Sequence, residues 1–301
     1  MELTFSSLAS AISWLFVLLT YQQYRERGKT HQLLWTLGIA SFAIAVTADT
    51  VARAQGGWTE NGYRIWYFFG AMHGVTLLGH GTLMLLNRQN WTQRLLEVVV
   101  VAMIVSAVVV SNAPINFAAL TSAFEPKGTA FPDIAQMGFA TPRFWTIPFN
   151  LYGTVWLVGG ALYSSLTLWR SHRPRAIGTL LIALAGLVLA GVSSLNRFGI
   201  DYLEAIGRMV GVTILFIGFL FTTLEPNALP KVNLPKVPPL VIAAVSGWGL
   251  ALAAFFQLEP AAWQAVIEYP GLFLIAGIIL GLFWLVLQKA RQRAKIFTNH
   301  E

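Results

Sequence analysis

The sequence predicts an all-α polytopic membrane protein with about nine transmembrane helices. Of its 301 residues 56% are hydrophobic and only 11% are charged, and the mean hydropathy is +0.62. A soluble domain carries roughly a quarter charged residues, so this composition excludes an ordinary soluble enzyme or binding module. The apolar residues also occur in runs of about 20, the length of helix that crosses a bilayer core.

Nine segments have this length, and the connections between them are rich in polar residues, glycine or proline. The N-terminal segment has no basic region before it and is interpreted as a first transmembrane helix rather than a signal peptide. We expect a seven-helix core at 1–225, a proline-rich linker at 226–238, and two further helices with a short basic tail at 239–301. The predicted spans are 5–24, 32–54, 62–87, 95–112, 147–169, 176–197, 204–224, 239–257 and 269–288.

The basic residues predict the orientation of the chain. Fourteen Lys and Arg residues lie in connections on one side of the predicted spans, whereas the opposite side has only Lys127 and Arg143. Because basic loops stay in the cytoplasm, we expect a multi-pass protein of the plasma membrane with its N-terminus outside and its C-terminus cytoplasmic. The net charge of +7 then reflects topology, and the expected partner is the lipid bilayer rather than nucleic acid. The fourteen are Arg25, Arg27, Lys29, Arg88, Arg94, Arg170, Arg173, Arg175, Lys231, Lys236, Lys289, Arg291, Arg293 and Lys295.

Two glycine-rich stretches indicate an internal repeat. GAMHGVTLLGHG (70–81) and GRMVGVTILFIG (207–218) are identical at seven of twelve positions. The pattern predicts a 3+1+3 plan, with repeat 1 at about 5–87, a linker helix at 95–112, an outer loop at 112–146 and repeat 2 at about 147–224. The recurring glycines are expected to let neighbouring helices approach closely.

The 3+1+3 plan resembles that of SWEET sugar transporters and, more loosely, that of seven-helix rhodopsins. The resemblance is one of topology only. The chain has no Pro-Gln pair, which is the signature of the sugar transporters, and no lysine inside a span to carry a retinal Schiff base. It implies a substrate site between the two repeats near the middle of the bilayer.

Two histidines lie in the first glycine-rich stretch. His73 is expected near the membrane midplane, and His80 lies two turns further along almost the same face. At about 10 Å along the helix axis they are too far apart to share a metal ion. Haem held between two histidines needs a second helix with a histidine at the same depth, and the other histidines lie at or beyond the cytoplasmic ends. These are His31, His172 and His300.

The two histidines allow two interpretations. They could be neutral side chains that bond to Ser, Thr or a carbonyl group of a neighbouring helix. Alternatively, they form a polar site or proton relay in a cavity between the repeats. The second copy has Val210 and Ile217 at the equivalent positions, so packing alone does not need them. No cofactor is predicted, although haem on a single histidine and a carotenoid remain open.

Charged residues gather at the outer ends of the second, third, sixth and seventh spans. Charges at such depth rarely face lipid, so they are expected to face the interior of the bundle or water. They could form structural salt bridges, or line a vestibule for an anionic ligand. The residues are Asp49, Arg53, Arg64, Arg197, Asp201, Glu204 and Arg208. The long loop that follows the fourth span is expected to cap the vestibule.

The sequence favours a protein that binds and translocates a small solute. His73 and His80 would be its intramembrane site, and Asp49 with the four arginines its outer vestibule. A receptor or accessory subunit that binds a lipid, quinone, pigment or haem is the alternative, and an intramembrane enzyme is a third possibility. The chain has no cysteine and no nucleotide or nucleophile motif. A homo-oligomer or a larger membrane complex is consistent with any of these.

Overall fold

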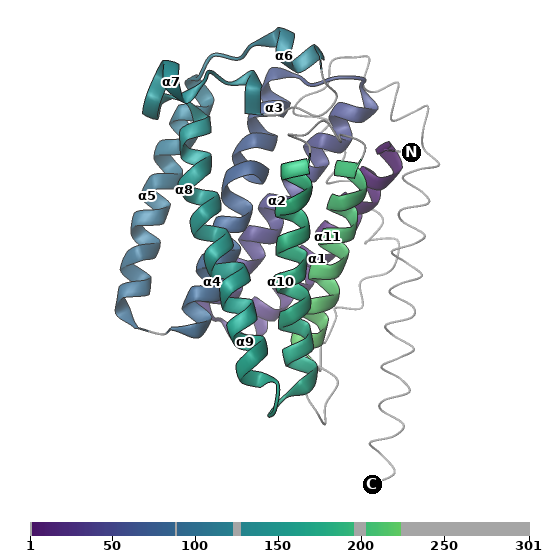
Figure 1. Cartoon of the computed structure of the whole chain (residues 1–301), viewed down its shortest axis with the longest axis vertical. Coiled ribbons are helices and arrows are strands. Elements are labelled where there is room, and N and C mark those ends of the chain that lie inside the picture. Colours follow the sequence, from purple (N-terminus) through teal and green to yellow (C-terminus); the bar gives the residue numbers. More distant parts are fainter. Residues whose placement is uncertain (1, 88, 123–127, 196–202, 224–301) are drawn as a thin grey trace.

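The computed structural model describes residues 2–87, 89–122, 128–195 and 203–223, and every regular element within these ranges is a helix (Figure 1). The prediction of an all-α chain with membrane-crossing helices is confirmed for this part of the chain. The predicted linker at 226–238 and the predicted spans at 239–257 and 269–288 lie outside it. Six helices are long and apolar enough to cross a membrane: Glu2–Arg27, Thr30–Ala54, Glu60–Leu86, Asn90–Asn112, Arg173–Gly191 and Glu204–Thr223.

Two rods of the bundle combine α-helical and π-helical segments. The first rod consists of α3 (Glu60–Trp66), the π-helix η1 (Tyr67–His73) and α4 (Gly74–Leu86). The second rod, at the place of the predicted span 147–169, consists of α8 (Pro142–Thr154), the π-helix η4 (Val155–Gly159) and α9 (Gly160–Leu168). Both begin at a threonine whose hydroxyl accepts a bond from the first turn, as a helix N-cap does.

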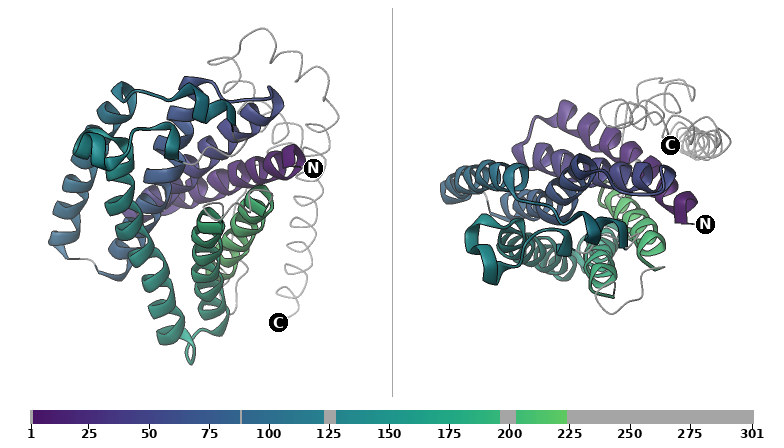
Figure 2. Two further views of the ribbon diagram at one scale, coloured as in Figure 1. Left: turned by 45° about the horizontal axis from the view of Figure 1, so that its top comes forward. Right: turned by 90° about the horizontal axis from the view of Figure 1, so that it is seen from above.

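The helices pack in a closed ring of six. The other long helices are α1 (Glu2–Arg27), α2 (Thr30–Ala54), α5 (Asn90–Asn112), α10 (Arg173–Leu195) and α11 (Leu203–Thr223). Around the ring, α1 contacts α2, α2 contacts α4, the second rod lies between α4 and α10, and α11 closes the ring against α1. The helix α5 lies outside it, against α4 and α8, and forms the edge of the bundle in the right-hand view of Figure 2.

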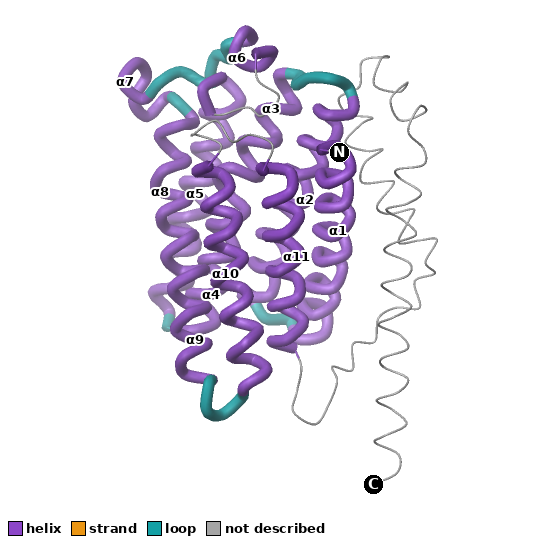
Figure 3. The backbone as a smooth tube through the Cα atoms, turned by 45° about the vertical axis from the view of Figure 1, so that its right-hand side comes forward, coloured by secondary structure: helices purple, strands orange, loops and turns teal. Residues whose placement is uncertain are grey.

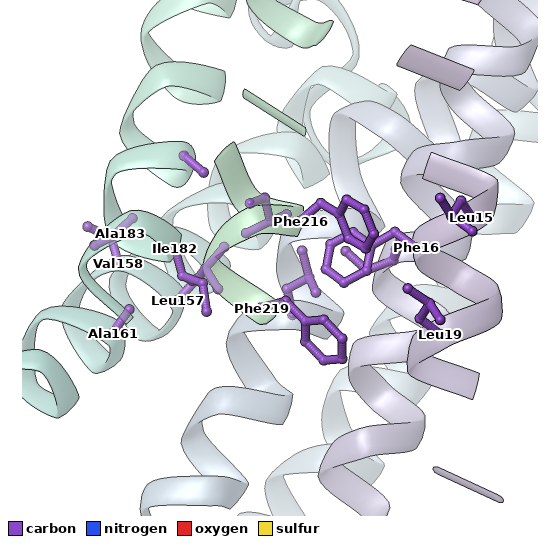
Figure 4. Close-up of a cluster of buried hydrophobic side chains, with 14 of the residues drawn as sticks. Leu15, Phe16, Leu19, Leu157, Val158, Ala161, Ile182, Ala183, Phe216 and Phe219 are labelled. Atoms are coloured by element: carbon purple, nitrogen blue, oxygen red, sulfur yellow. The ribbon is translucent and has the colours of Figure 1, made fainter. Parts of the chain in front are cut away.

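All six members of the ring contribute to one apolar core. Phe16 of α1 lies against Phe216 and Phe219 of α11, with ring centroids 5.2 and 5.1 Å apart (Figure 4). The same buried cluster includes Ile39 of α2, Leu78 of α4, Leu157 of η4 and Ile182 of α10. Apolar side chains therefore join every ring helix at this level.

A cap of short helices covers one end of the bundle, which we call the cap end (Figure 3). It consists of α6 (Phe117–Ser122), η2 (Gly128–Ala130), α7 (Ile134–Met137) and η3 (Gly138–Ala140). Phe131 is its anchor, because it is buried with its ring centroid 5.1 Å from that of Tyr63 and 4.9 Å from that of Tyr67. The cap thus packs on the first rod.

An acidic residue orders the exposed part of the cap. The carboxylate of Asp133 accepts a hydrogen bond from the backbone N–H of Ala135 at 3.0 Å and forms an ion pair with Arg143 at 2.8 Å. The backbone bond and the neighbouring guanidinium hold the pKa of Asp133 below its ordinary value. This residue is the N-cap of α7.

Candidate functional site

The buried carboxylate of Asp49 is the centre of a polar site at the cap end. Asp49 is only 1% exposed. One of its oxygens accepts hydrogen bonds from the Ser6 hydroxyl at 2.6 Å and from Arg53 Nε at 2.9 Å. Its other oxygen accepts a bond from Arg208 Nη2 at 3.3 Å. Three helices, α1, α2 and α11, therefore meet on one carboxylate.

Two further carboxylates extend this site. Arg53 reaches Glu2 of α1 at 2.6 Å, and Arg208 lies 3.4 Å from Glu204, one turn away on its own helix. We call this set the cap-end ion network: Glu2, Ser6, Asp49, Thr50, Arg53, Glu204 and Arg208. A buried charge is tolerated in a bilayer only when it is paired and hydrogen-bonded, and here the two guanidiniums share three carboxylates.

The ion pairs of the network differ in length. The Asp49–Arg53 pair lies within one helix, and the Arg53–Glu2 pair joins α1 to α2. The links made by Arg208 are longer, at 3.3 Å to Asp49 and 3.4 Å to Glu204. The contact that joins α11 to the first two helices is therefore longer than the pairs made by Arg53, and Asp49 has Arg53 as a second cationic partner.

Arg64 does not join this network. Its guanidinium pairs with Glu60 at 2.5 Å, donates a hydrogen bond to the carbonyl oxygen of Val110, and lies over the ring of Phe131. It thus fixes α5 and the cap to the first rod, which differs from the single vestibule expected from the sequence. Arg197 and Asp201 lie outside the described residues.

His73 lies between the first rod, α5 and α8. Its Nδ1 is 2.5 Å from the carbonyl oxygen of Phe68, five residues earlier in the π-helical segment, and its Nε2 is 3.1 Å from the hydroxyl of Ser106 on α5. The imidazole is 1% exposed and lies beside the rings of Phe68 and Phe149. Both ring nitrogens therefore have partners.

His80 joins the same three helices two turns further along. Its Nδ1 is 2.6 Å from the hydroxyl of Tyr152 on α8, and its Nε2 is 3.1 Å from the carbonyl oxygen of Thr92 on α5. The partners of both histidines are hydroxyl and carbonyl groups, three of them on neighbouring helices and one, the carbonyl of Phe68, on the same rod. Among the described residues, neither histidine forms a hydrogen bond to α1, α2, α10 or α11, so they are separate from the cap-end ion network.

Sequence reasoning missed several members of these sites. Ser6, Ser10 and Ser13 lie on one face of α1 by their spacing. Ser6 bonds to Thr50 at 2.9 Å and Ser10 to Thr47 at 2.8 Å, which joins α1 to α2. A row of hydroxyl side chains on one face of an apolar helix could have predicted these contacts, because such side chains form hydrogen bonds between helices in a membrane. Nothing in the sequence pointed to Ser106 or Tyr152 as histidine partners.

Among the described residues, no group of three His, Cys, Asp or Glu side chains could hold a metal ion. His31 and His172 lie at the end of the bundle opposite the cap, so the described part provides no second histidine at the depth of His73 for a shared haem.

Comparison with known proteins gives no family. No family model matches the chain, and no curated protein or solved structure is significantly similar to it. Any statement about function therefore depends on the site itself.

Proposed function

We propose that the protein is a carrier that moves a small anionic solute across the plasma membrane, with its N-terminus outside and the cap end facing outward. The carrier consists of two three-helix units: α1, α2 and the first rod, and the second rod, α10 and α11. The observation that carries the proposal is the Asp49–Arg208 ion pair, which joins the two units at the cap end. This ion pair is the outer gate.

The glycines support two equivalent units. Gly74 and Gly211 are paired by the sequence repeat, as are Gly81 and Gly218. In the first unit a Cβ at Gly81 would lie 3.0 Å from the carbonyl oxygen of residue 31 on α2. In the second unit a Cβ at Gly218 would lie 2.8 Å from the carbonyl oxygen of residue 178 on α10. Each glycine thus faces the middle helix of its own unit, as a parallel repeat requires.

The two junctions between the units differ in a way that suits a rocking motion. Where α4 meets α8, Gly79 and Gly153 bring the two backbones into direct contact. Where α1 and α2 meet α11, the contacts include the aromatic side chains of α1 and α11 and the Asp49–Arg208 pair between α2 and α11. Close backbone packing suits a fixed axis, and a long ion pair with large side chains suits a surface that opens.

An anionic solute can open this gate by replacing Asp49 as the partner of Arg208. Asp49 keeps its bonds to Arg53 and Ser6, so neither charge is left without a partner during the exchange. Towards the other end, the core around Phe16 and Phe216 joins the units, so the described arrangement corresponds to a closed state. Guanidinium groups recognise carboxylates with particular strength, which makes a small carboxylate the favoured class of solute.

A disulfide lock tests this proposal, because the chain has no cysteine of its own. Ala9 of α1 and Val212 of α11 belong to one buried cluster, so Ala9→Cys with Val212→Cys is designed to join the two units when oxidised. Ser10→Cys with Thr47→Cys is the matched control, since it joins α1 to α2 inside one unit. The assay is uptake of labelled acetate, lactate and succinate into proteoliposomes.

We expect oxidation to stop uptake in the first variant, a reductant to restore it, and the control to be unaffected. Uptake that continues through a complete cross-link between α1 and α11 would overturn the rocking mechanism. Absence of uptake of all three carboxylates by the unmodified protein would overturn the proposed solute class.

A further inference from the structure

The two buried histidines differ in how their hydrogen bonds are satisfied. At His80, Nε2–H donates to the carbonyl oxygen of Thr92, which leaves Nδ1 to accept from the hydroxyl of Tyr152. A neutral imidazole has one donor and one acceptor, so both bonds are made. A second proton on this ring would require the Tyr152 hydroxyl to turn its hydrogen away from Nδ1, and among the described residues that hydroxyl has no other hydrogen-bond partner. The site of His80 therefore satisfies the neutral imidazole better than the charged one.

At His73 the partner on α5 is a hydroxyl that can bond to either the neutral or the protonated imidazole. Nδ1–H must donate to the carbonyl oxygen of Phe68, so Nε2 faces the Ser106 hydroxyl, which carries a single hydrogen. That hydroxyl is also 2.8 Å from the carbonyl oxygen of Met103. When Ser106 donates to Nε2, the ring is neutral. When Ser106 donates to Met103, its oxygen is free to accept a bond from a protonated Nε2.

We propose that His73 is a proton-binding site, with Ser106 as the rotating hydroxyl that accommodates both protonation states. A proton from water adds to the lone pair of Nε2, the ring becomes an imidazolium that donates from both nitrogens, and the Ser106 hydrogen turns to Met103. Release reverses each step. If the protein is the proposed carrier, this proton is the ion that moves with the anionic solute; that coupling alone rests on the proposed function.

The aromatic and charged groups around His73 affect the stability of its protonated form. Phe68 and Phe149 lie with their ring centroids 4.2 and 4.9 Å from that of the imidazole, within the range of a cation–π contact. No charged side chain of the described residues bonds to it. Four elements pack around the segment that contains His73: its own rod, α2, α5 and the second rod. Their charged and titratable groups are Glu60, Tyr63, Arg64, Tyr67 and His80 on its own rod, His31, Asp49 and Arg53 on α2, Arg94 and Glu97 on α5, and Arg143, Tyr152 and Tyr163 on the second rod.

The helix α5 is the most loosely packed of the long helices around His73. Only 17% of its membrane-crossing window is buried inside the bundle, against 61% for the first rod. Few contacts therefore resist a small displacement of α5, and Ser106 moves with it. Such a displacement separates the Ser106 hydroxyl from Nε2 while Nδ1 stays bonded to Phe68 on its own rod.

The test is the ¹⁵N NMR spectrum of ¹⁵N-histidine-labelled protein in lipid bilayers, from about pH 4 to about pH 9, the range in which an imidazole titrates when its surroundings shift it. Imidazole ¹⁵N shifts separate the two neutral tautomers from the imidazolium. Signals are assigned with a variant whose only histidine is His73 and a matched variant whose only histidine is His80. If a sole-histidine variant does not fold, His73→Phe and His80→Phe provide the assignment by loss of a signal.

We expect His73 to change from the Nδ1–H tautomer to the imidazolium within this range, and His80 to remain the Nε2–H tautomer. Ser106→Ala should shift the midpoint for His73 without altering the signals of His80. A neutral His73 throughout, or the same midpoint with and without the Ser106 hydroxyl, would overturn the proposal. Titration of His73 in a protein that takes up no carboxylate would leave the proton site in place and remove only the carrier.

Discussion

Gly79 of α4 and Gly153 of α8 meet backbone to backbone, and a Cβ on Gly79 would lie 2.8 Å from the Cα of Gly153. We predict that Gly153→Ala separates the two rods and lowers the thermal unfolding temperature in detergent, since its new Cβ would lie 2.6 Å from the backbone of Val75. Backbone atoms cannot move aside as a flexible side chain can.

Gly159→Ala is the control for this prediction. Gly159 lies on the same rod, in the π-helical segment, and a Cβ there would meet nothing within 4 Å. Alanine should be neutral at this position or should stabilise the protein by up to about 1 kcal/mol, because glycine inside a helix is unfavourable. Equal unfolding temperatures for the two variants would contradict the close contact of α4 with α8.

Removing the Asp49 charge should destabilise the protein strongly. Asp49→Asn leaves Arg53 and Arg208 without the carboxylate that joins them, and breaking a buried ion pair in this way costs about 3–5 kcal/mol. Adding Arg208→Gln should recover part of the loss. The measurement is the free energy of unfolding in mixed micelles.

Glu60→Gln is the matched control, because Glu60 and Arg64 have the same spacing but the Glu60 side chain is 42% exposed. Exposed pairs contribute about 0–1 kcal/mol. If Asp49→Asn lowers the free energy of unfolding no more than Glu60→Gln does, the result would argue against a network buried from water.

His80 and Tyr152 should show strong coupling in a double-mutant cycle. His80→Ile leaves the Tyr152 hydroxyl without its partner, at a cost of about 1–3 kcal/mol. Tyr152→Phe in the same chain removes this unpaired hydroxyl, so the double variant should be more stable than the sum of the two single losses predicts. Additive losses in thermal unfolding would show that the bond contributes nothing.

Phe131→Ala should release the cap without unfolding the bundle. Phe131 is 2% exposed between Tyr63 and Tyr67, and truncating a buried Phe costs about 3–5 kcal/mol. Limited proteolysis should then cut within 113–141 much faster, while the long helices stay protected. Phe139→Ala, at a side chain 71% exposed, should leave the cutting rate unchanged.

Reporter fusions test the predicted orientation. Fusions after Lys29, Arg94 and Arg175 should report cytoplasm, and fusions near Gly57 and Ala130 should report the outside, because of the distribution of basic residues. A fusion after Lys236 should report cytoplasm and a fusion near Trp263 should report the outside, which extends the test to the two additional predicted spans. Opposite signals at any two positions would refute the nine-span topology.

The sequence predicted the long helices well because their signal is local. Runs of apolar residues located all seven long helical stretches of the described residues, although α5 begins at Asn90 rather than near residue 95. The cap helices between 113 and 141 were not predicted. They are short, and Phe131 holds them through contacts with distant residues of the first rod rather than through their own periodicity.

The composition of the sites could be predicted only in part. Asp49, Arg53, Glu204 and Arg208 do come together, as their shared depth suggested. Depth does not specify which face of a helix a side chain occupies, and for this reason Arg64 was grouped with them although it lies against Val110 and Phe131. The partners of the histidines, Ser106 and Tyr152, are 33 and 72 residues away in the chain.

The pairing of Asp49 with Arg208 has a consequence for how the protein is made. These residues are 159 positions apart, so α2 enters the membrane long before α11 has been synthesised. Until then the carboxylate has only Ser6 and Arg53 for partners, and α1 and α2 lack the aromatic neighbours that α11 brings to Phe16. The newly inserted amino-terminal hairpin is thus an incomplete intermediate, and its contacts with Arg208 and with the aromatic side chains of α11 form only when the last helix of the ring arrives.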